Sequence, residues 1–321
     1  MIEDDNYSSI SRDFQQYSKI LDKLGYLPIP SKSDRILYEA AKGSIERLGL
    51  SASKAILNHI CSIDGLSEEE LLTNYDLLEK SLKRVLREGA EVLLHDIKKG
   101  VLAGAILIDP TITIREIRNP RFTIVDILER IRSAEILEFI RKGASHKHIA
   151  FLYRNENAKN KIFSAFFDTK ITGKASNGLL LSKKSSNDLS HVLKYVDNSI
   201  LYEELLQESH DEKVVAKKLA DWVAKLDSLK LHPDKTNKYA TRIASEDVTW
   251  WVRNGFADHY YIGLEESMGR DLQDNLSVLC GYNISEHSNN KNGTIKTMIA
   301  THGYVILDEP FIVYRAPGVG Y

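Results

Sequence analysis

The chain has little cysteine and no long apolar run. Its two cysteines, Cys61 and Cys280, are far apart in the sequence. A disulfide framework needs more cysteines and an oxidising compartment, so we expect a reduced, cytoplasmic location. No apolar run approaches the roughly 20 residues that a membrane-spanning helix needs. The first residues, Met-Ile-Glu-Asp, are acidic where a signal peptide would be basic. The sequence therefore predicts no contact with a membrane.

An excess of charge of one sign is also missing. The chain has 43 basic and 45 acidic residues among 321, for a formal net charge of −2. Proteins that attract nucleic acid through their overall field are strongly basic, so direct DNA binding is not expected. Hydrophobic residues make up 43% of the chain, which is enough for two domains with cores of their own.

The chain lacks a phosphate-binding loop as well. Residues 148–153, His-Ile-Ala-Phe-Leu-Tyr, have the composition of a buried first strand in an α/β sheet. The turn that follows is Arg154-Asn-Glu-Asn157, where a nucleotide-binding domain would have glycines and a lysine. A later segment, Thr172-Gly-Lys174, lacks the first glycine of such a loop and follows a helix rather than a strand. These absences argue against nucleotide hydrolysis and favour sensing or docking.

Changes in composition divide the chain into four parts. The polar start closes with Pro28-Ile-Pro30, and the connecting helix begins at Thr123 and carries an apolar stripe. That stripe is suited to packing on the α/β domain or on a second copy of the chain, as in a homodimer. The predicted parts are a leader (1–30), flexible or loosely docked with one helix across Phe14–Leu24, a helical bundle (31–105), a linker with a connecting helix (106–144) and an α/β domain (145–321).

Strand and helix patterns alternate in the last part. The expected strands are His148–Tyr153, Gly178–Ser182, Ser199–Tyr202, Tyr239–Ala244, Leu276–Tyr282, Tyr304–Leu307 and, as an antiparallel edge, Phe311–Tyr314. The expected helices are Ala158–Phe167, Leu189–Val196, Glu212–Leu229, Asp258–Gln273 and Thr294–Thr301. This alternation predicts a mostly parallel, doubly wound sheet, preceded by a small all-α bundle.

Four short motifs follow one another in the α/β domain. They are His148–Tyr153 with Glu156, Thr241–Glu246 with Thr249 and Trp250, Leu279–Asn283, and Thr301–Gly303. In order and spacing they resemble the MEDS family, the sensory domain named for methanogens, methylotrophs and the dichloromethane regulator. The resemblance implies a RecA-like or clock-ATPase-like fold without a phosphate loop, found beside regulatory and kinase modules.

The helical part resembles a small archaeal module, the Nitrosopumilus-type output domain. The segments that carry this resemblance are Asp34–Glu39, Leu48–Gly49, Ala55–His59 and Arg87–Ala90. Together the two resemblances imply an output bundle joined to an input domain.

The best candidate binding site lies after the strand that ends near Ala244. Glu246 comes at the carboxyl end of that strand, where open α/β sheets bind ligands. Trp250 and Trp251 follow, with Arg253 as a polar neighbour, and predict either an apolar ligand pocket or ordinary packing of a helix on the sheet. From the resembling motifs, the ligand-binding candidates also include Tyr153, His148, Tyr282 and His302.

Metal and catalytic roles are not predicted. His146 and His148 share a strand face and two imidazoles can hold a metal ion, but a histidine that hydrogen-bonds across the sheet is the preferred interpretation. Cys280 has the pattern of a small buried hydrophobe, and His302 follows a helix whose dipole it can contact. We expect no catalytic residue, no metal and no cofactor.

These features predict a cytoplasmic protein of signal transduction or transcription regulation that is not an enzyme. Its α/β domain would sense a small molecule or a protein partner, and its helical bundle would relay the output. The alternatives are a nucleotide-dependent α/β enzyme and a structural adaptor that senses nothing.

Overall fold

The computed structural model describes most of the chain. The described residues are 16–112, 122–143, 147–168, 176–182, 194–197, 199–208, 211–229, 240–246, 248–254, 256, 276–284, 292–308 and 311–319. Contacts divide the chain into two compact units: Pro30–Ile136, here called the helical unit, and Met1–Ile29 with Leu137–Tyr321, called the sheet unit. The predicted class, α/β with helices toward the N-terminus, is confirmed.

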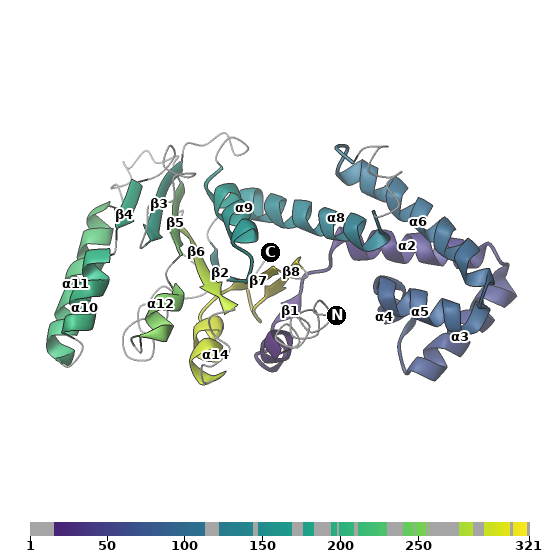
Figure 1. Ribbon diagram of the computed structural model, residues 1–321, viewed down its shortest axis with the longest axis horizontal. Coiled ribbons are helices and arrows are strands. Elements are labelled where there is room, and N and C mark those ends of the chain that lie inside the picture. The colour runs from purple at the N-terminus through teal and green to yellow at the C-terminus, as the bar shows by residue number, and fades with distance from the viewer. Residues whose placement is uncertain are drawn as a thin grey trace, which may run out of the picture. The chain divides into compact units, whose positions relative to one another are not determined.

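An eight-stranded mixed sheet, counted over the described residues, organises the sheet unit (Figure 1). The strands are β1 (Leu27–Pro28), β2 (His148–Tyr153), β3 (Ser176–Ser182), β4 (Lys194–Asp197), β5 (Ala240–Ser245), β6 (Leu276–Asn283), β7 (Tyr304–Asp308) and β8 (Phe311–Arg315). Their order is β1-β8-β7-β2-β6-β5-β3-β4. The pairs from β7 through to β4 are all parallel, so the sheet is mostly parallel, as predicted.

One edge of the sheet is formed by residues that the sequence assigns to a flexible leader. β8 pairs antiparallel with β7, as predicted, but β1 then pairs antiparallel with β8 and takes the edge position. Pro28 has no N–H to donate, which suits an edge strand. Residues 16–23 form a helix, and the Tyr26 side chain is buried. The described part of the leader is therefore folded into the sheet unit.

Helices connect the parallel strands. They are α9 (Glu156–Phe167), α10 (Ser199–Gln207), α11 (Glu212–Leu229), α12 (Val248–Arg253) and α14 (Asn292–Ala300), with a π-helical turn η1 (Phe139–Gly143) before β2. The predictions for α9, α11 and α14 are confirmed within a few residues.

Two local predictions are wrong. Ser199–Tyr202 is the start of helix α10 rather than a strand, because Tyr202 and Leu205, three residues apart, bury one helical face. The strand of this region is β4, which includes the end of the helix expected at Leu189–Val196. Residues 183–193 and the helix expected at Asp258–Gln273 lie outside the described residues.

Neighbouring residues of β6 show which face of the sheet α9 covers. Gly281 points toward α9, where an added Cβ would lie 3.0 Å from the ring of Phe163. Cys280 is adjacent in the strand and therefore points to the opposite face. In the neighbouring strand β2, Ala150 pairs with Cys280, so it shares that opposite face.

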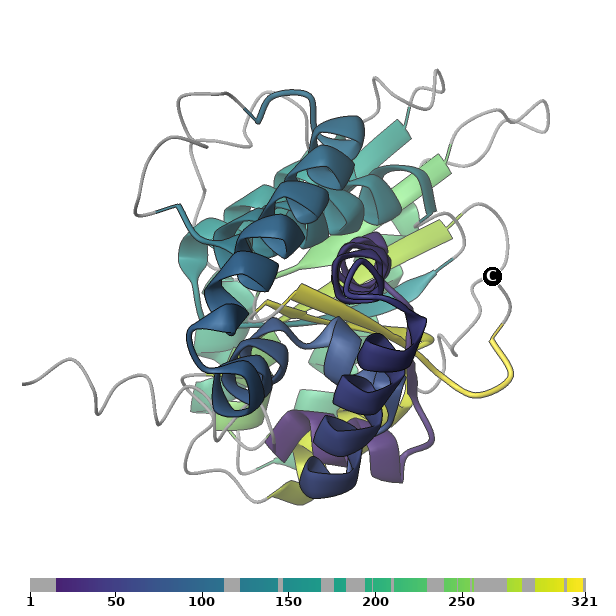
Figure 2. The same cartoon turned by 90° about the vertical axis from the view of Figure 1, so that its right-hand side faces the viewer.

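In the described ranges 30–112 and 122–136, the helical unit has five helices up to residue 108 and a further one after residue 122 (Figure 2). They are α2 (Lys32–Glu46), α3 (Leu50–Asp64), α4 (Glu68–Thr73), α5 (Tyr75–Leu86), α6 (Gly89–Ile108) and α8 (Ile124–Glu138). Ser67 caps α4 in a capping box with Glu70. Gly49 lies between α2 and α3, where its φ of 94° turns the chain into α3. The linker expected from residue 106 begins later, since α6 continues to Ile108.

The connecting helix α8 packs into the helical unit. Its buried residues Ile124, Ile127, Leu128 and Ile131 belong to the same apolar core as those of α2 and α6. The apolar stripe of the connecting helix is therefore covered at these positions by the bundle.

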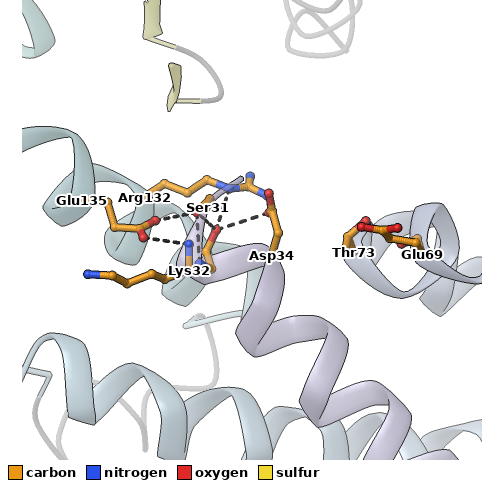
Figure 3. A network of polar contacts seen from close by, with 8 residues as sticks. Ser31, Lys32, Asp34, Glu69, Thr73, Arg132 and Glu135 are labelled. Carbon is orange, nitrogen blue, oxygen red and sulfur yellow. Dashed lines mark hydrogen bonds and ion pairs between the residues drawn. The ribbon is translucent and has the colours of Figure 1, made fainter. Parts of the chain in front are cut away.

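Two charged residues of α8 hold the first turn of α2 (Figure 3). Arg132 donates from Nη2 to Asp34 Oδ1 at 2.7 Å and from Nε to Ser33 Oγ at 2.9 Å. Glu135 accepts from the Lys32 amide at 2.7 Å. These charge-assisted bonds use groups at a helix N-terminus that would otherwise face water.

Candidate functional site

The turn between β2 and α9 is the place where a nucleotide-binding α/β protein would hold phosphate. Here the amides of Arg154 and Asn155 both donate to Asp308 Oδ2, at 2.7 and 3.1 Å. Asp308 ends the neighbouring strand β7 and its side chain is buried. Burial raises the pKa of Asp308, while the two amide hydrogen bonds oppose that rise by stabilising the charged form. An internal carboxyl group therefore occupies the anion position of this turn.

An ion pair lies near this turn, at the carboxyl ends of the parallel strands, here called the carboxyl edge of the sheet. Lys159 of α9 is 3.7 Å from Glu246 Oε1, just past β5, and 2.6 Å from Glu156. Its ammonium also lies over the ring of Tyr153, 5.8 Å from the centroid. Tyr153 and Glu246, both predicted as ligand-binding residues, thus share one cation. The side chains of Lys159 and Glu246 are only 13% and 9% exposed.

The predicted aromatic site is a stack of rings. Trp250 stacks on Tyr202, with ring centroids 4.0 Å apart, and on Phe256, with centroids 5.5 Å apart, and both rings are nearly parallel to it. Trp251 is buried and meets Trp250 and Tyr202 edge to face. Arg253 is exposed. Two protein rings therefore already stack on Trp250.

Three potential metal ligands converge inside the sheet unit. His148 begins β2, Cys280 lies in the middle of β6, and His302 follows α14. One donor atom from each side chain lies within 4.8 Å of the other two, and all three residues are buried. Cys280 Sγ is 3.7 Å from His148 Nε2, and the two imidazole centroids are 4.0 Å apart. We call this group the His-Cys-His cluster.

Backbone pairing sets the geometry of the His-Cys-His cluster. Pairing of β2 with β6 places His148 opposite Val278 and Ala150 opposite Cys280, so the small Ala150 lies beside the thiol. The amide of Gly303 donates to the His148 carbonyl at 3.0 Å, which fixes the residue after His302 against β2. These contacts belong to the sheet and its flanking turn, so the cluster rests on rigid elements.

One ring nitrogen of His302 is fixed by the backbone. His302 Nδ1 lies 2.8 Å from the Met298 carbonyl oxygen. A carbonyl only accepts, so Nδ1 carries the hydrogen of this bond, and when the ring is neutral the lone pair is on Nε2. Tyr282 approaches the His302 ring edge to face, with centroids 5.8 Å apart.

The helical unit has a cleft of its own, of about 390 Å³. Residues of α5, α6 and the start of α8 line it, among them Glu79, Glu91 and Thr123. Burial, followed by the neighbouring acidic groups, raises the pKa of Tyr75 in this cleft to about 12. Nothing in the sequence singled this cleft out.

The structure places seven of the eight predicted ligand residues in three locations. Tyr153 and Glu246 lie at the carboxyl edge, Trp250 and Trp251 in the aromatic stack, and His148, Tyr282 and His302 around the His-Cys-His cluster, while Arg253 is on the surface. His148 and Tyr153 sit at opposite ends of β2, roughly 16 Å apart at about 3.3 Å per residue. Sequence reasoning missed Asp308 and Lys159 at the edge, and it treated Cys280 as inert. His146 lies outside the described residues.

No family model, curated protein or solved structure matches the chain. Among the helices in the described ranges, none has the length and apolar content that crossing a bilayer requires.

Proposed function

We propose that the chain is a cytoplasmic, non-enzymatic protein of signal transduction or transcription regulation. The sheet unit, a RecA-like domain of the MEDS type without a phosphate loop, would bind a small molecule or a protein partner. The helical unit would relay that state as output.

The occupied turn between β2 and α9 carries this proposal. A RecA-like ATPase binds phosphate through free amides at this turn. In this chain Asp308 accepts hydrogen bonds from the amides of Arg154 and Asn155. The Asn155 side-chain oxygen accepts one from the amide of Asn157, at 2.8 Å. A phosphate group would have to displace an internal carboxyl group that is buried and already bonded. This supports a RecA-like sheet that does not bind or hydrolyse nucleotides.

Helix α8 provides a route for the relay. It runs from Ile124 to Glu138, and the chain divides into its two units at Ile136. Its first residues, Ile124 and Val125, line the cleft of the helical unit. The π-helical turn η1 follows its other end, and such turns are frequent at functional sites. A shift of α8 along its axis would therefore change the shape of the cleft.

The test begins with ligand binding to the full chain. Thermal unfolding is measured against a panel of nucleotides with Mg²⁺, metabolites and small apolar compounds, since a ligand of the native state raises the melting temperature. Any stabilising compound is then used in hydrogen exchange, with a non-stabilising analogue as control. The proposal expects altered exchange in residues 31–142, because a relay requires a coupling free energy between the units.

Two results would contradict it. Stabilisation by Mg²⁺ and ATP above that by any other compound would favour the nucleotide-dependent enzyme. A ligand that stabilises the sheet unit while leaving exchange in residues 31–142 unchanged would rule out the relay.

A further inference from the structure

We propose that His148, Cys280 and His302 form a binding site for a transition-metal ion of the zinc type. The inference is independent of the regulatory role, since it concerns only what these three side chains hold. It would stand if the protein relayed no signal.

The ligand types select the metal. Two imidazoles and one thiolate are the donors that zinc and copper prefer, whereas magnesium and calcium take oxygen ligands. The three donor atoms already lie within 4.8 Å of one another. In a tetrahedral zinc site a bound nitrogen and a bound sulfur are about 3.6 Å apart, from metal distances of about 2.05 and 2.3 Å. The observed separation of His148 Nε2 and Cys280 Sγ is 3.7 Å.

The surroundings of His302 fit a metal ligand. Histidines that bind zinc commonly donate the other ring N–H to a backbone carbonyl, which fixes the ring and its tautomer. His302 does this through Nδ1 and the Met298 carbonyl, at 2.8 Å. A neutral ring with its lone pair on Nε2 is the form that binds a metal ion.

Burial distinguishes this cluster from a chance surface grouping. The exposed fractions of His148, Cys280 and His302 are 0%, 1% and 0%. Buried ionisable groups require partners, and an ion would balance the charge of the thiolate. The three residues come from separate segments that the fold brings together, so an ion bound by them would link β2, β6 and the segment after α14. Three protein ligands leave a fourth position for water or a small donor.

Binding is a proton-coupled step. The Cys280 thiol releases its proton to solvent as sulfur binds the ion, and both histidines bind as neutral rings. The site should therefore lose affinity on acidification. No electron is transferred.

The test uses cobalt as a probe in the full-length, untagged chain. Protein is purified from cells grown in cobalt-supplemented minimal medium, with a phosphine reductant present, and metal is counted by mass spectrometry. Thiolate bound to Co²⁺ gives a charge-transfer band in the near ultraviolet, and a tetrahedral ion gives intense visible bands. The key variant is Cys61→Ser, because the chain has two cysteines and this change leaves Cys280 as the sole thiol.

We expect one cobalt ion per chain in both the native protein and Cys61→Ser, with the sulfur charge-transfer band retained in each. His302→Gln should raise the Kd for zinc by more than about 100-fold, beyond the loss from an outer-sphere partner. Cys280→Ser should abolish the band. The Cys61→Ser result decides the matter even if the buried variants fold poorly. Cys61→Ser protein that folds but holds no cobalt, or holds it without a sulfur band, would overturn the site.

Discussion

The hydroxyl of Tyr26 donates a hydrogen bond to the carbonyl oxygen of Ile299, 2.7 Å away and 273 positions later in the chain. The carbonyl of His302 lies 2.5 Å from the same hydroxyl, so one proton is shared by two acceptors. Tyr26 thus fixes the segment that carries a proposed metal ligand. This contact adds to the pairing of β1 with β8 and to the hydrogen bond between Ser18 and Tyr314, which also join the start of the chain to the sheet.

Tyr26→Phe is expected to destabilise the sheet unit by about 1–3 kcal/mol, because two buried carbonyls lose their donor. Urea unfolding followed by tryptophan fluorescence measures this unit alone, since the three tryptophans, Trp222, Trp250 and Trp251, all belong to it. Leu27→Ala, at an exposed position next to Tyr26, is the control and should change stability by less than about 0.5 kcal/mol. Equal effects of the two substitutions would show that the hydroxyl does not anchor the leader.

Asp308 should make stability depend on pH. Burial raises the pKa of Asp308 above the unfolded value of about 3.9. Between the unfolded and the folded pKa, the folded chain therefore keeps a proton that the unfolded chain has lost. The stabilising contribution is fully present below the unfolded pKa and is lost as pH rises through the folded pKa. Asp308→Asn cannot titrate and keeps an acceptor for the two amides. We therefore expect the stability of Asp308→Asn relative to the native chain to improve from pH 4 to pH 7.

The companion variant Asp308→Ala separates charge from hydrogen bonding. It leaves the amides of Arg154 and Asn155 without their acceptor, at a cost of about 2–4 kcal/mol at pH 7. Both variants are compared by urea unfolding at several pH values. An Asn variant that becomes relatively more stable on acidification would contradict the sign of this pKa shift.

Gly100 and Gly43 offer a matched pair in the helical unit. A Cβ on Gly100 of α6 would lie 2.8 Å from the Cβ of Ala40 in α2, whereas a Cβ on Gly43 meets nothing within 4 Å. Alanine favours a helix over glycine by about 1 kcal/mol, so Gly43→Ala should stabilise by about 0.5–1 kcal/mol. Gly100→Ala should destabilise by about 1–3 kcal/mol, because the two backbones must separate.

Hydrogen exchange of α6 in the full chain measures both substitutions, since the helical unit has no tryptophan. Exchange of α6 amides should become faster in Gly100→Ala and slower or unchanged in Gly43→Ala. If Gly100→Ala also protected α6, the close approach of α2 and α6 would not be required.

Trp250 tests the predicted ligand pocket against packing. Its ring stacks on both Tyr202 and Phe256, so Trp250→Ala should lower the free energy of unfolding by about 2–4 kcal/mol without any ligand. Arg253→Ala, at an exposed position of the same helix, is the control and should cost less than about 0.5 kcal/mol. The fluorescence of Trp222 and Trp251 follows unfolding. Unchanged stability in Trp250→Ala would contradict the packing role and leave the ring available to a ligand, the other alternative that the sequence offers.

Local patterns predicted most of the sheet. β2 and β6 are buried along most of their length, and their apolar runs were recognised because a central parallel strand has no polar face. The error at Ser199–Tyr202 has a physical cause: Ile, Leu and Tyr suit a strand locally, but Tyr202 and Leu205 bury one side of a helix. β1 has two residues and contains a proline, so no pattern of its own could reveal it.

The candidate site could be predicted only in part. Each of His148, Cys280 and His302 is unremarkable in its own segment, and their meeting depends on which strands are neighbours and in which register. Cys280 of β6 pairs with Ala150 of β2, and His148 lies two residues before Ala150 on the same face of β2. This register brings the Cys280 thiol to the His148 imidazole. The missing phosphate loop was visible in the sequence, but the carboxyl group that fills its place comes from β7, some 150 residues later.

The position of β1 has a consequence for synthesis of the chain. The helical unit, residues 30–136, is complete long before the sheet, and it can fold while the rest is still being translated. Leu27, made before any of it, pairs with Arg315. The earliest described strand to leave the ribosome is therefore among the last to be paired, because β8, its partner, is made after all the other described strands.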